Sequence, residues 1–186
     1  MKLAREALMH YIDSSFGKAT ATATASWFLI GKDIDDMSVE LNPDTETTKN
    51  ILGETTVKDN GYEPSMSADP YYANPDDSIY GKLVDIAMNR LKGDKCKTKI
   101  LEVIIKDTAD ATHQAWVEDV IVKPQSYGGD TSGVSIPFDV LFDGNRQEGT
   151  VTITDGAPTF RPKAASPGTS NIKSQSLDDE HKTIID

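Results

Sequence analysis

The sequence predicts a mainly β (α+β) protein: an antiparallel β-sandwich or partly closed barrel, with one flanking α-helix and a long projecting β-hairpin arm. Three observations carry this prediction. Residues 134–142 place large apolar side chains at every second position, the period of a strand with one buried face. Residues 97–106 hold a nearly continuous apolar run, typical of a strand covered on both faces. Residues 77–92 combine helical periodicity with signals for both helix ends.

Composition describes a well-hydrated protein of one domain, with or without terminal tails. The chain has 186 residues, of which 37% are apolar, and its mean hydropathy is −0.44. No segment approaches the roughly 18 consecutive apolar residues of a membrane helix. Arg5 and Glu6 interrupt the apolar region that a signal peptide needs. The single cysteine, Cys96, excludes an internal disulfide and fits a reducing cytoplasm.

Acidic residues dominate the charge balance, with 30 Asp and Glu against 19 Lys and Arg, a net charge of −11. Proteins that grip nucleic acid do so with Lys and Arg that displace counterions from the phosphates. The balance therefore argues against a DNA-binding protein. It fits a surface that DNA passes without adhering, and it equally fits negative charge that only maintains solubility.

The first half of the chain begins with a predicted amphipathic helix over residues 1–12, whose apolar face holds Leu3, Ala7, Leu8, Tyr11 and Ile12. An Ala/Thr alternation predicts a strand over residues 18–30, and a second strand is expected near residues 37–41. Residues 42–70 are polar and turn-rich. Within them, Asn60-Gly61 predicts the two-residue turn of a projecting arm, between strands at 54–59 and 62–67.

The helix at 77–92 is expected to be capped by Asp76 or Asp77 and to end at Gly93. Its apolar arc is wider than one sheet face can cover, so it is either deeply buried or meets another subunit, and we favour the second interpretation. The arc comprises Ile79, Tyr80, Leu83, Val84, Ile86, Ala87, Met88 and Leu91.

Three long strand regions are predicted after the helix: residues 97–106, residues 114–124, and a hairpin over residues 129–154. The hairpin is expected to reverse at Asp143-Gly144-Asn145, because Gly and Asn tolerate positive φ. Residues after Arg161 have little apolar surface to pack and are expected to form a flexible tail.

No constellation in the sequence supports catalysis or a metal site. Asp33, Asp35, Asp36 and Glu40 offer closely spaced oxygens but lack the central Gly and the alternating ligands of a calcium loop. His10, His113 and His181 lack partners at zinc spacing. Ser132 sits among glycines as a protease nucleophile does, yet only His113 could serve as its base, and no histidine motif surrounds it. We predict no enzyme activity, no cofactor and no metal.

Three blocks carry a family resemblance. They are SYGGDTSGVSIPFDVLFDGNRQEGT (Ser126 to Thr150), WFLIGKDIDDMSVELNPDTETTKNILGETTVKDNGYEPS (Trp27 to Ser65) and SADPYYANPDDSIYGKLVDIA (Ser67 to Ala87). In this order and spacing they resemble major tail tube proteins of tailed phages of Gram-positive hosts. The resemblance covers about residues 24–156, and the blocks look closer to the non-contractile kind.

This resemblance implies a subunit of stacked, hexameric rings that form a channel for genome passage, with a fold shared by contractile phage tubes and type VI secretion tubes. It implies a location in the virion tail after assembly in the host cytoplasm. Expected partners are the protein itself, a tape measure protein, a tail terminator and tail-tip or baseplate proteins. DNA would pass through the channel without specific binding, and no membrane is involved.

Under this interpretation, residues 1–20 form an N-terminal helix or arm, residues 21–160 the tail tube domain, and residues 161–186 a C-terminal extension. Contacts within a ring are assigned to the helix face of Ile79, Tyr80, Leu83 and Ile86. Contacts between rings are assigned to Lys49, Asn50, Ile51, Leu52, Asn60, Gly61 and Tyr62. The alternative is a monomeric β-sandwich that serves as a binding or decoration module of a virion.

Overall fold

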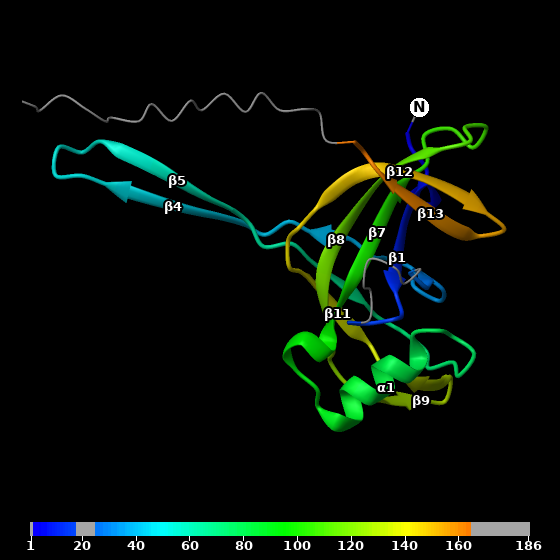
Figure 1. The fold of residues 1–186 in the computed structure, drawn as a ribbon. Helices are drawn as coiled ribbons and strands as arrows, with labels where there is room; N and C mark the ends of the chain where they lie inside the picture. The colour runs from blue at the N-terminus through cyan, green and yellow to red at the C-terminus, as the bar shows by residue number, and fades with distance from the viewer. Residues whose placement is uncertain (1, 18–24, 165–186) are drawn as a thin grey trace, which may run out of the picture.

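The computed structural model describes residues 2–17 and 25–164. They form a nine-stranded antiparallel sheet that curves into a half-barrel, with one α-helix and additional hairpins (Figure 1). The predicted fold class is therefore confirmed. β12 (Gln147–Thr154) pairs with β8 beyond the end of β11, and β13 (Ala157–Pro162) pairs with β12. The other strands follow the order β2 (Trp27–Ile30), β1 (Leu8–Asp13), β7 (Lys97–Ile104), β8 (His113–Pro124), β11 (Phe138–Phe142), β6 (Ser65–Ala68) and β3 (Val39–Glu40).

The two longest core strands, β7 and β8, lie where the sequence predicts them and pair from Lys97 opposite Ile121 to Ile104 opposite Gln114. Successive residues of a strand point to opposite faces of the sheet. Accordingly, Ile100 joins the core cluster that contains the helix residues, whereas Leu101 and Val103 join a second cluster on the other face. The apolar run in β7 thus reflects a strand buried on both sides.

The hairpin predicted over residues 129–154 is wrong. β11 pairs with residues 120–124 of β8 and β12 pairs with residues 113–117, both antiparallel, so the chain keeps its direction along β8. Four residues, 143–146, stand opposite two of β8 and bulge outward, with Gly144 and Asn145 at φ of 87° and 57°. Positive φ serves a bulge as well as a reversal, so the turn residues alone did not distinguish the two.

The true hairpin in this region joins β12 to β13. Its two-residue turn is Asp155-Gly156, with φ of 51° and 78°, and Thr154 pairs with Ala157 across it. An Asp-Gly pair is a strong signal for such a turn.

The N-terminal helix predicted for residues 1–12 is also wrong. A short 3-10 turn, η1 (Arg5–Ala7), leads into β1, which lies inside the sheet between β2 and β7. Tyr11 and Ile12, expected on one helix face, instead occupy the two opposite core clusters. In so short a segment, the apolar residues fit both periods. The Ala/Thr segment falls partly outside the described residues, and its described end forms β2.

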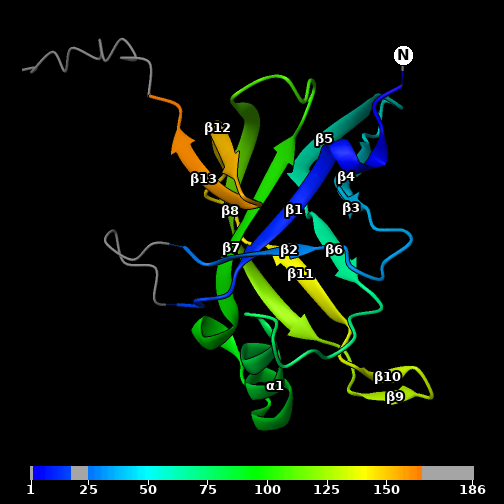
Figure 2. The same ribbon diagram turned by 90° about the vertical axis from the view of Figure 1, so that its right-hand side faces the viewer.

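The helix α1 (Tyr80–Asn89) is shorter than the predicted 77–92. Its N-cap is Ile79, without a side-chain cap, while the Asp77 carboxylate accepts hydrogen bonds from Tyr71 and Asn74. It ends at Arg90, which adopts the left-handed conformation, and Gly93 instead begins a second 3-10 turn, η2 (Gly93–Cys96). The small hairpin of β9 (Gly128–Asp130) and β10 (Gly133–Ser135) lies at the same end of the molecule as α1 (Figure 2).

The predicted arm is present but shorter than residues 42–70. β4 (Pro43–Lys49) and β5 (Thr55–Tyr62) pair only with each other and project far from the half-barrel (Figure 1). The following residues return to the main sheet as β6, between β11 and β3.

Candidate assembly surfaces

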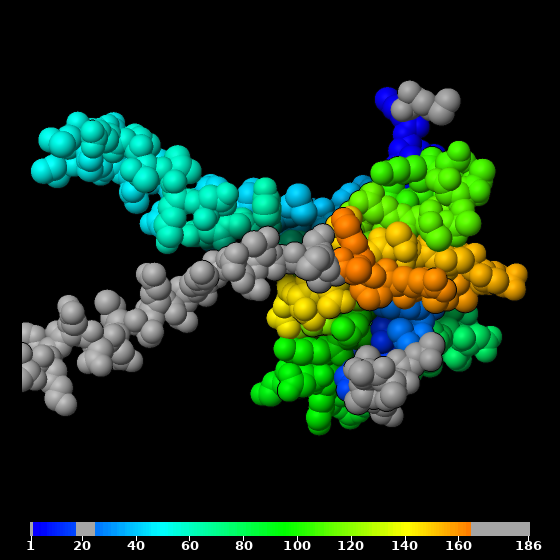
Figure 3. All heavy atoms as spheres, turned by 45° about the horizontal axis from the view of Figure 1, so that its top comes forward, coloured from blue at the N-terminus to red at the C-terminus, as the bar shows by residue number. Residues whose placement is uncertain are grey.

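The arm is exposed to solvent on both faces. Every residue of β4 and every residue of β5 except Gly61 is exposed, and the space-filling view shows the arm standing clear of the body (Figure 3). A two-stranded hairpin is marginally stable alone in water, and both of its edges carry unpaired backbone groups. The arm is therefore a surface that would gain stability from a partner.

Asn50 organises the end of the arm, residues 50–54, which we call the arm tip. Its Oδ1 accepts hydrogen bonds from the backbone N–H of Leu52 (3.0 Å) and of Glu54 (2.9 Å). Its Nδ2 donates to Glu54 Oε2 at 2.6 Å. Gly53 closes the loop at φ of 84°, a left-handed conformation that glycine adopts without steric cost. This arrangement presents two apolar side chains to water: Ile51 is fully exposed and Leu52 is 79% exposed.

Asn60-Gly61 does not form the predicted tip. Asp44 pairs with Gly61 and Thr45 with Asp59, so Asn60 is the extra residue of a β-bulge near the base of the arm. Of the predicted inter-ring residues, the structure brings Lys49, Asn50, Ile51 and Leu52 together at the far end. It places Asn60, Gly61 and Tyr62 at the other end, where Tyr62 pairs with Pro43 and stays exposed.

The predicted helix face lies mostly inside the chain's own core. Ile79, Leu83 and Ile86 are buried against the first core cluster, so these side chains do not form a contact surface. The wide apolar arc is explained in large part by this burial, the interpretation that we did not favour. Tyr80 is half-buried, and Met88 is the large apolar residue of α1 that remains exposed. An intra-ring contact through α1 stays a prediction for these two residues.

A groove of about 500 Å³ runs beside β1 and β2, and we call it the N-terminal groove. Much of its lining is apolar, with Leu8, Leu29, Ile34 and Met37 among the lining residues. Arg5 spans it, donating one hydrogen bond to the Leu8 carbonyl (2.7 Å) and one to the Met37 carbonyl (2.9 Å). These bonds fix the loop between β2 and β3 against the N-terminal segment. The charged lining residues are two cations, Arg5 and Lys32, and two carboxylates, Glu6 and Asp35.

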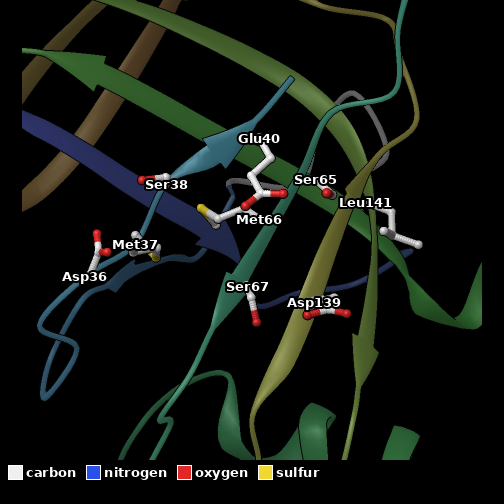
Figure 4. Close-up of a pocket in the computed structure, with 9 residues that line it drawn as sticks. All are labelled: Asp36, Met37, Ser38, Glu40, Ser65, Met66, Ser67, Asp139 and Leu141. Carbon is white, nitrogen blue, oxygen red and sulfur yellow. The ribbon is translucent and has the colours of Figure 1, made fainter. Parts of the chain in front are cut away.

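A second hollow, of about 340 Å³, lies at the sheet edge formed by β3, β6 and β11 (Figure 4). Its charged residues are all carboxylates: Asp36, Glu40 and Asp139. Ser38, Ser65 and Ser67 add hydroxyl groups, and the partly exposed Leu141 lies on its rim. We call this the acidic hollow.

A buried polar cluster occupies the sheet face between β1 and the bulge at residues 143–146. Arg146 Nη1 lies 2.6 Å from Glu102 Oε2 and 2.7 Å from Glu118 Oε2, and the two carboxylates are only 11% and 9% exposed. His10 Nε2 lies 3.5 Å from Glu102 Oε1. Burial raises the pKa of the Glu102 carboxyl, but the adjacent His10 and Arg146 outweigh it and hold this pKa below its usual value. The guanidinium also lies over the Trp116 ring, 5.6 Å from its centroid.

Sequence reasoning missed this cluster because its members are distant in the chain and join only across β1, β7, β8 and the bulge. The sequence did contain one sign of a buried polar cluster: Glu102 and Glu118 are charged residues within strands that are otherwise largely apolar. An aromatic side chain in a core strand is an expected core residue, but the Trp116 ring is only half-buried and lies beneath Arg146. Trp27 and Phe28 of β2 are partly buried at the margin of the two core clusters.

The residues tested for chemistry do not gather. Ser132 lies in the turn of the β9–β10 hairpin beside α1, whereas His113 begins β8 at the other end of the half-barrel (Figure 1). Within residues 2–17 and 25–164, no three His, Cys, Asp or Glu side chains cluster as a metal site would require. In the same part of the chain, no helix has the length and apolar character needed to cross a membrane.

No protein-family model matches the chain, and no curated protein does. Among solved structures, it is similar to the SPP1 tail tube at 15% identity and a TM-score of 0.49, covering 83% of this chain and 82% of that one. It is similar to the sheath/tube terminator of the extracellular contractile injection system PVC in its extended state (10% identity, TM-score 0.47, 80% and 96% covered). The tube-terminating cap of the anti-feeding prophage gives 10% identity, a TM-score of 0.45, and coverage of 88% and 93%. At this level of identity, no functional residue is carried over to this chain.

Proposed function

We propose that this chain is a structural subunit of a phage tail tube, assembling with copies of itself into stacked, hexameric rings around a channel for the genome. The observation that carries the proposal is the arm. A hairpin exposed on both faces, with Ile51 and Leu52 held out at its tip, is stabilised only when another surface covers it. The resemblance of three sequence blocks to tail tube proteins supplies the kind of assembly.

The remaining parts of the proposal follow from this assembly. The arm tip makes contacts between rings, and the exposed part of α1 at Tyr80 and Met88 makes contacts within a ring. Residues 161–186 act as an extension of a tube domain that ends near residue 160. The net charge of −11 repels DNA, so that it slides along the wall. A tape measure protein, a tail terminator and tail-tip or baseplate proteins are the proposed further partners in the virion tail.

Negative-stain electron microscopy, with size-exclusion chromatography over a concentration series, tests this function. We expect rings or tubes with a central channel for the full chain. Replacing residues 45–59 with two glycines removes most of the arm and should leave a folded monomer that does not polymerise. Full-length protein that stays monomeric at every concentration, also with a tail-tip complex added as a nucleus, would favour the binding or decoration module instead.

A further inference from the structure

The arm tip needs an acceptor surface, and the N-terminal groove and the acidic hollow are both large enough to be candidates. A third hollow, of about 490 Å³, has four charged side chains among its seven lining residues and therefore suits an apolar tip less well. We propose that the N-terminal groove of one copy receives the arm tip of another copy. This inference rests on the proposed self-assembly, because it names the surface of the same chain that completes the contact. It concerns the contact itself and holds whether the two copies lie in one ring or in successive rings.

The apolar character of the two surfaces matches. The arm tip exposes Ile51 and Leu52, and the residues lining the groove include aliphatic and thioether side chains such as Leu8 and Ile34. Leu29, on the groove, is itself 44% exposed, so apolar area on both sides is removed from water when they meet. The groove volume of about 500 Å³ lies in the range of sites that bury a bound group.

The arm tip and the N-terminal groove are also each held in shape by hydrogen bonds of their own. Asn50 holds the tip loop in one conformation through its side-chain hydrogen bonds, and Arg5 fixes the two walls of the groove to each other. These bonds reduce the ordering that contact requires within the tip loop and at the groove, which lowers the entropic cost of association.

Charge selects the N-terminal groove over the acidic hollow. Residues 43–62 hold four carboxylates, Asp44, Glu46, Glu54 and Asp59, against Lys49 and Lys58, a net charge of −2. The acidic hollow presents three carboxylates and no cation, so it repels the arm. The N-terminal groove carries two charges of each sign, which allows Glu54 to approach Lys32 and Lys49 to approach Asp35.

The arm and the strands beside the groove lie on opposite sides of the half-barrel. The arm projects from one side of the half-barrel in Figure 1, and β1 and β2 lie on the opposite side, nearest the viewer in Figure 2. A chain cannot insert its own tip into its own groove in this arrangement. A contact between different patches of two copies is heterologous, and repetition of it gives a closed ring or an open filament.

Disulfide trapping between two copies tests the acceptor. Chains carrying Leu52→Cys are mixed with separately tagged chains carrying Leu29→Cys, under mild oxidation and over the same concentration series as the chromatography. The matched control replaces the second partner with Leu141→Cys, which is similarly exposed (41%) but lies on the acidic hollow. Cys96 is fully buried and stays in place, with the unsubstituted chain as its own control.

We expect the Leu52→Cys and Leu29→Cys mixture to give at least about tenfold more linked heterodimer than the control mixture. Ile51→Ala and Leu52→Ala should each raise the concentration needed for assembly by roughly tenfold or more, since burial of such a side chain contributes that much. Val134→Ala, at a similarly exposed position on the body in β10, should leave it unchanged.

Three outcomes separate the inference from the function on which it rests. Assembled tubes with the dominant cross-link at Leu141→Cys, or with neither cross-link, overturn the groove as acceptor while the tube function stands. Linked heterodimers through Leu29→Cys without rings or tubes support the groove contact and contradict the tube. A chain that neither assembles nor cross-links overturns both.

Discussion

Arg146→Ala should destabilise the fold far more than a surface charge removal, because it leaves two buried carboxylates without their cation. Arg146 lies 2.6 Å from Glu102 and 2.7 Å from Glu118, both about nine-tenths buried. Breaking a buried ion pair costs about 3–5 kcal/mol when one charge is left uncompensated. The Arg146 side chain is itself 44% exposed, so water reaches the site and the expected loss is about 2–3 kcal/mol.

Urea denaturation followed by far-UV circular dichroism measures this loss, at concentrations where the chain is monomeric. Lys163→Ala is the matched control: its ion pair with Glu148 is exposed on both sides, and its removal should cost less than about 1 kcal/mol. The Arg146→Ala penalty should also shrink as the pH falls, since protonation neutralises the stranded carboxylates. A penalty no larger than that of Lys163→Ala, or one that does not change with pH, would refute this account of the cluster.

Three further predictions follow from particular contacts. The pKa of Glu102 is lowered in the folded protein, so its ionised form stabilises the fold at pH values above the unfolded pKa of about 4.3. This stability is lost as the pH falls through the folded pKa. Glu102→Gln should therefore flatten the acid limb of a curve of unfolding free energy against pH. Gly149→Ala places a Cβ against the Arg161 carbonyl and 2.6 Å from the Phe160 ring, so it should destabilise the fold by about 1–3 kcal/mol. Gly81→Ala lies in α1 with open space around it, and it should stabilise the fold by about 0.5–1 kcal/mol in the same denaturation assay. Asn50→Ala should weaken assembly in size-exclusion chromatography while leaving the melting temperature of the body unchanged, because the hydrogen bonds of its side chain lie within the arm tip; a lowered melting temperature would contradict a role confined to the tip.

The sequence by itself determined the elements whose signal is local and repeated. The alternation of apolar residues through β11 and the continuous apolar run of β7 predicted these strands, because burial of one face imposes period 2 and burial of both faces removes it. The helix near residues 80–89 was predicted from its helical periodicity, and the arm from a polar, turn-rich segment, which are both local signals.

Which strands pair with each other, and in which direction the chain runs, could be learned only from the tertiary structure. Turn residues at 143–145 and at 60–61 indicate only that the backbone can adopt positive φ there. A β-bulge meets that requirement as well as a hairpin turn does. The segment 8–13 became a strand because β2 and β7 supply hydrogen bonds on both sides, which outweighs a short helical pattern.

The candidate surfaces also differ in whether the sequence or only the tertiary structure could reveal them. Lys49 to Leu52 were assigned to the arm from the sequence because they lie in a polar, turn-rich segment, which is a local feature. The N-terminal groove and the cluster of His10, Glu102, Glu118 and Arg146 were not predicted from the sequence, because each joins residues from distant segments. Only the folded sheet determines which side chains become neighbours, and it buried Ile79, Leu83 and Ile86, which the helical pattern had assigned to a contact between subunits.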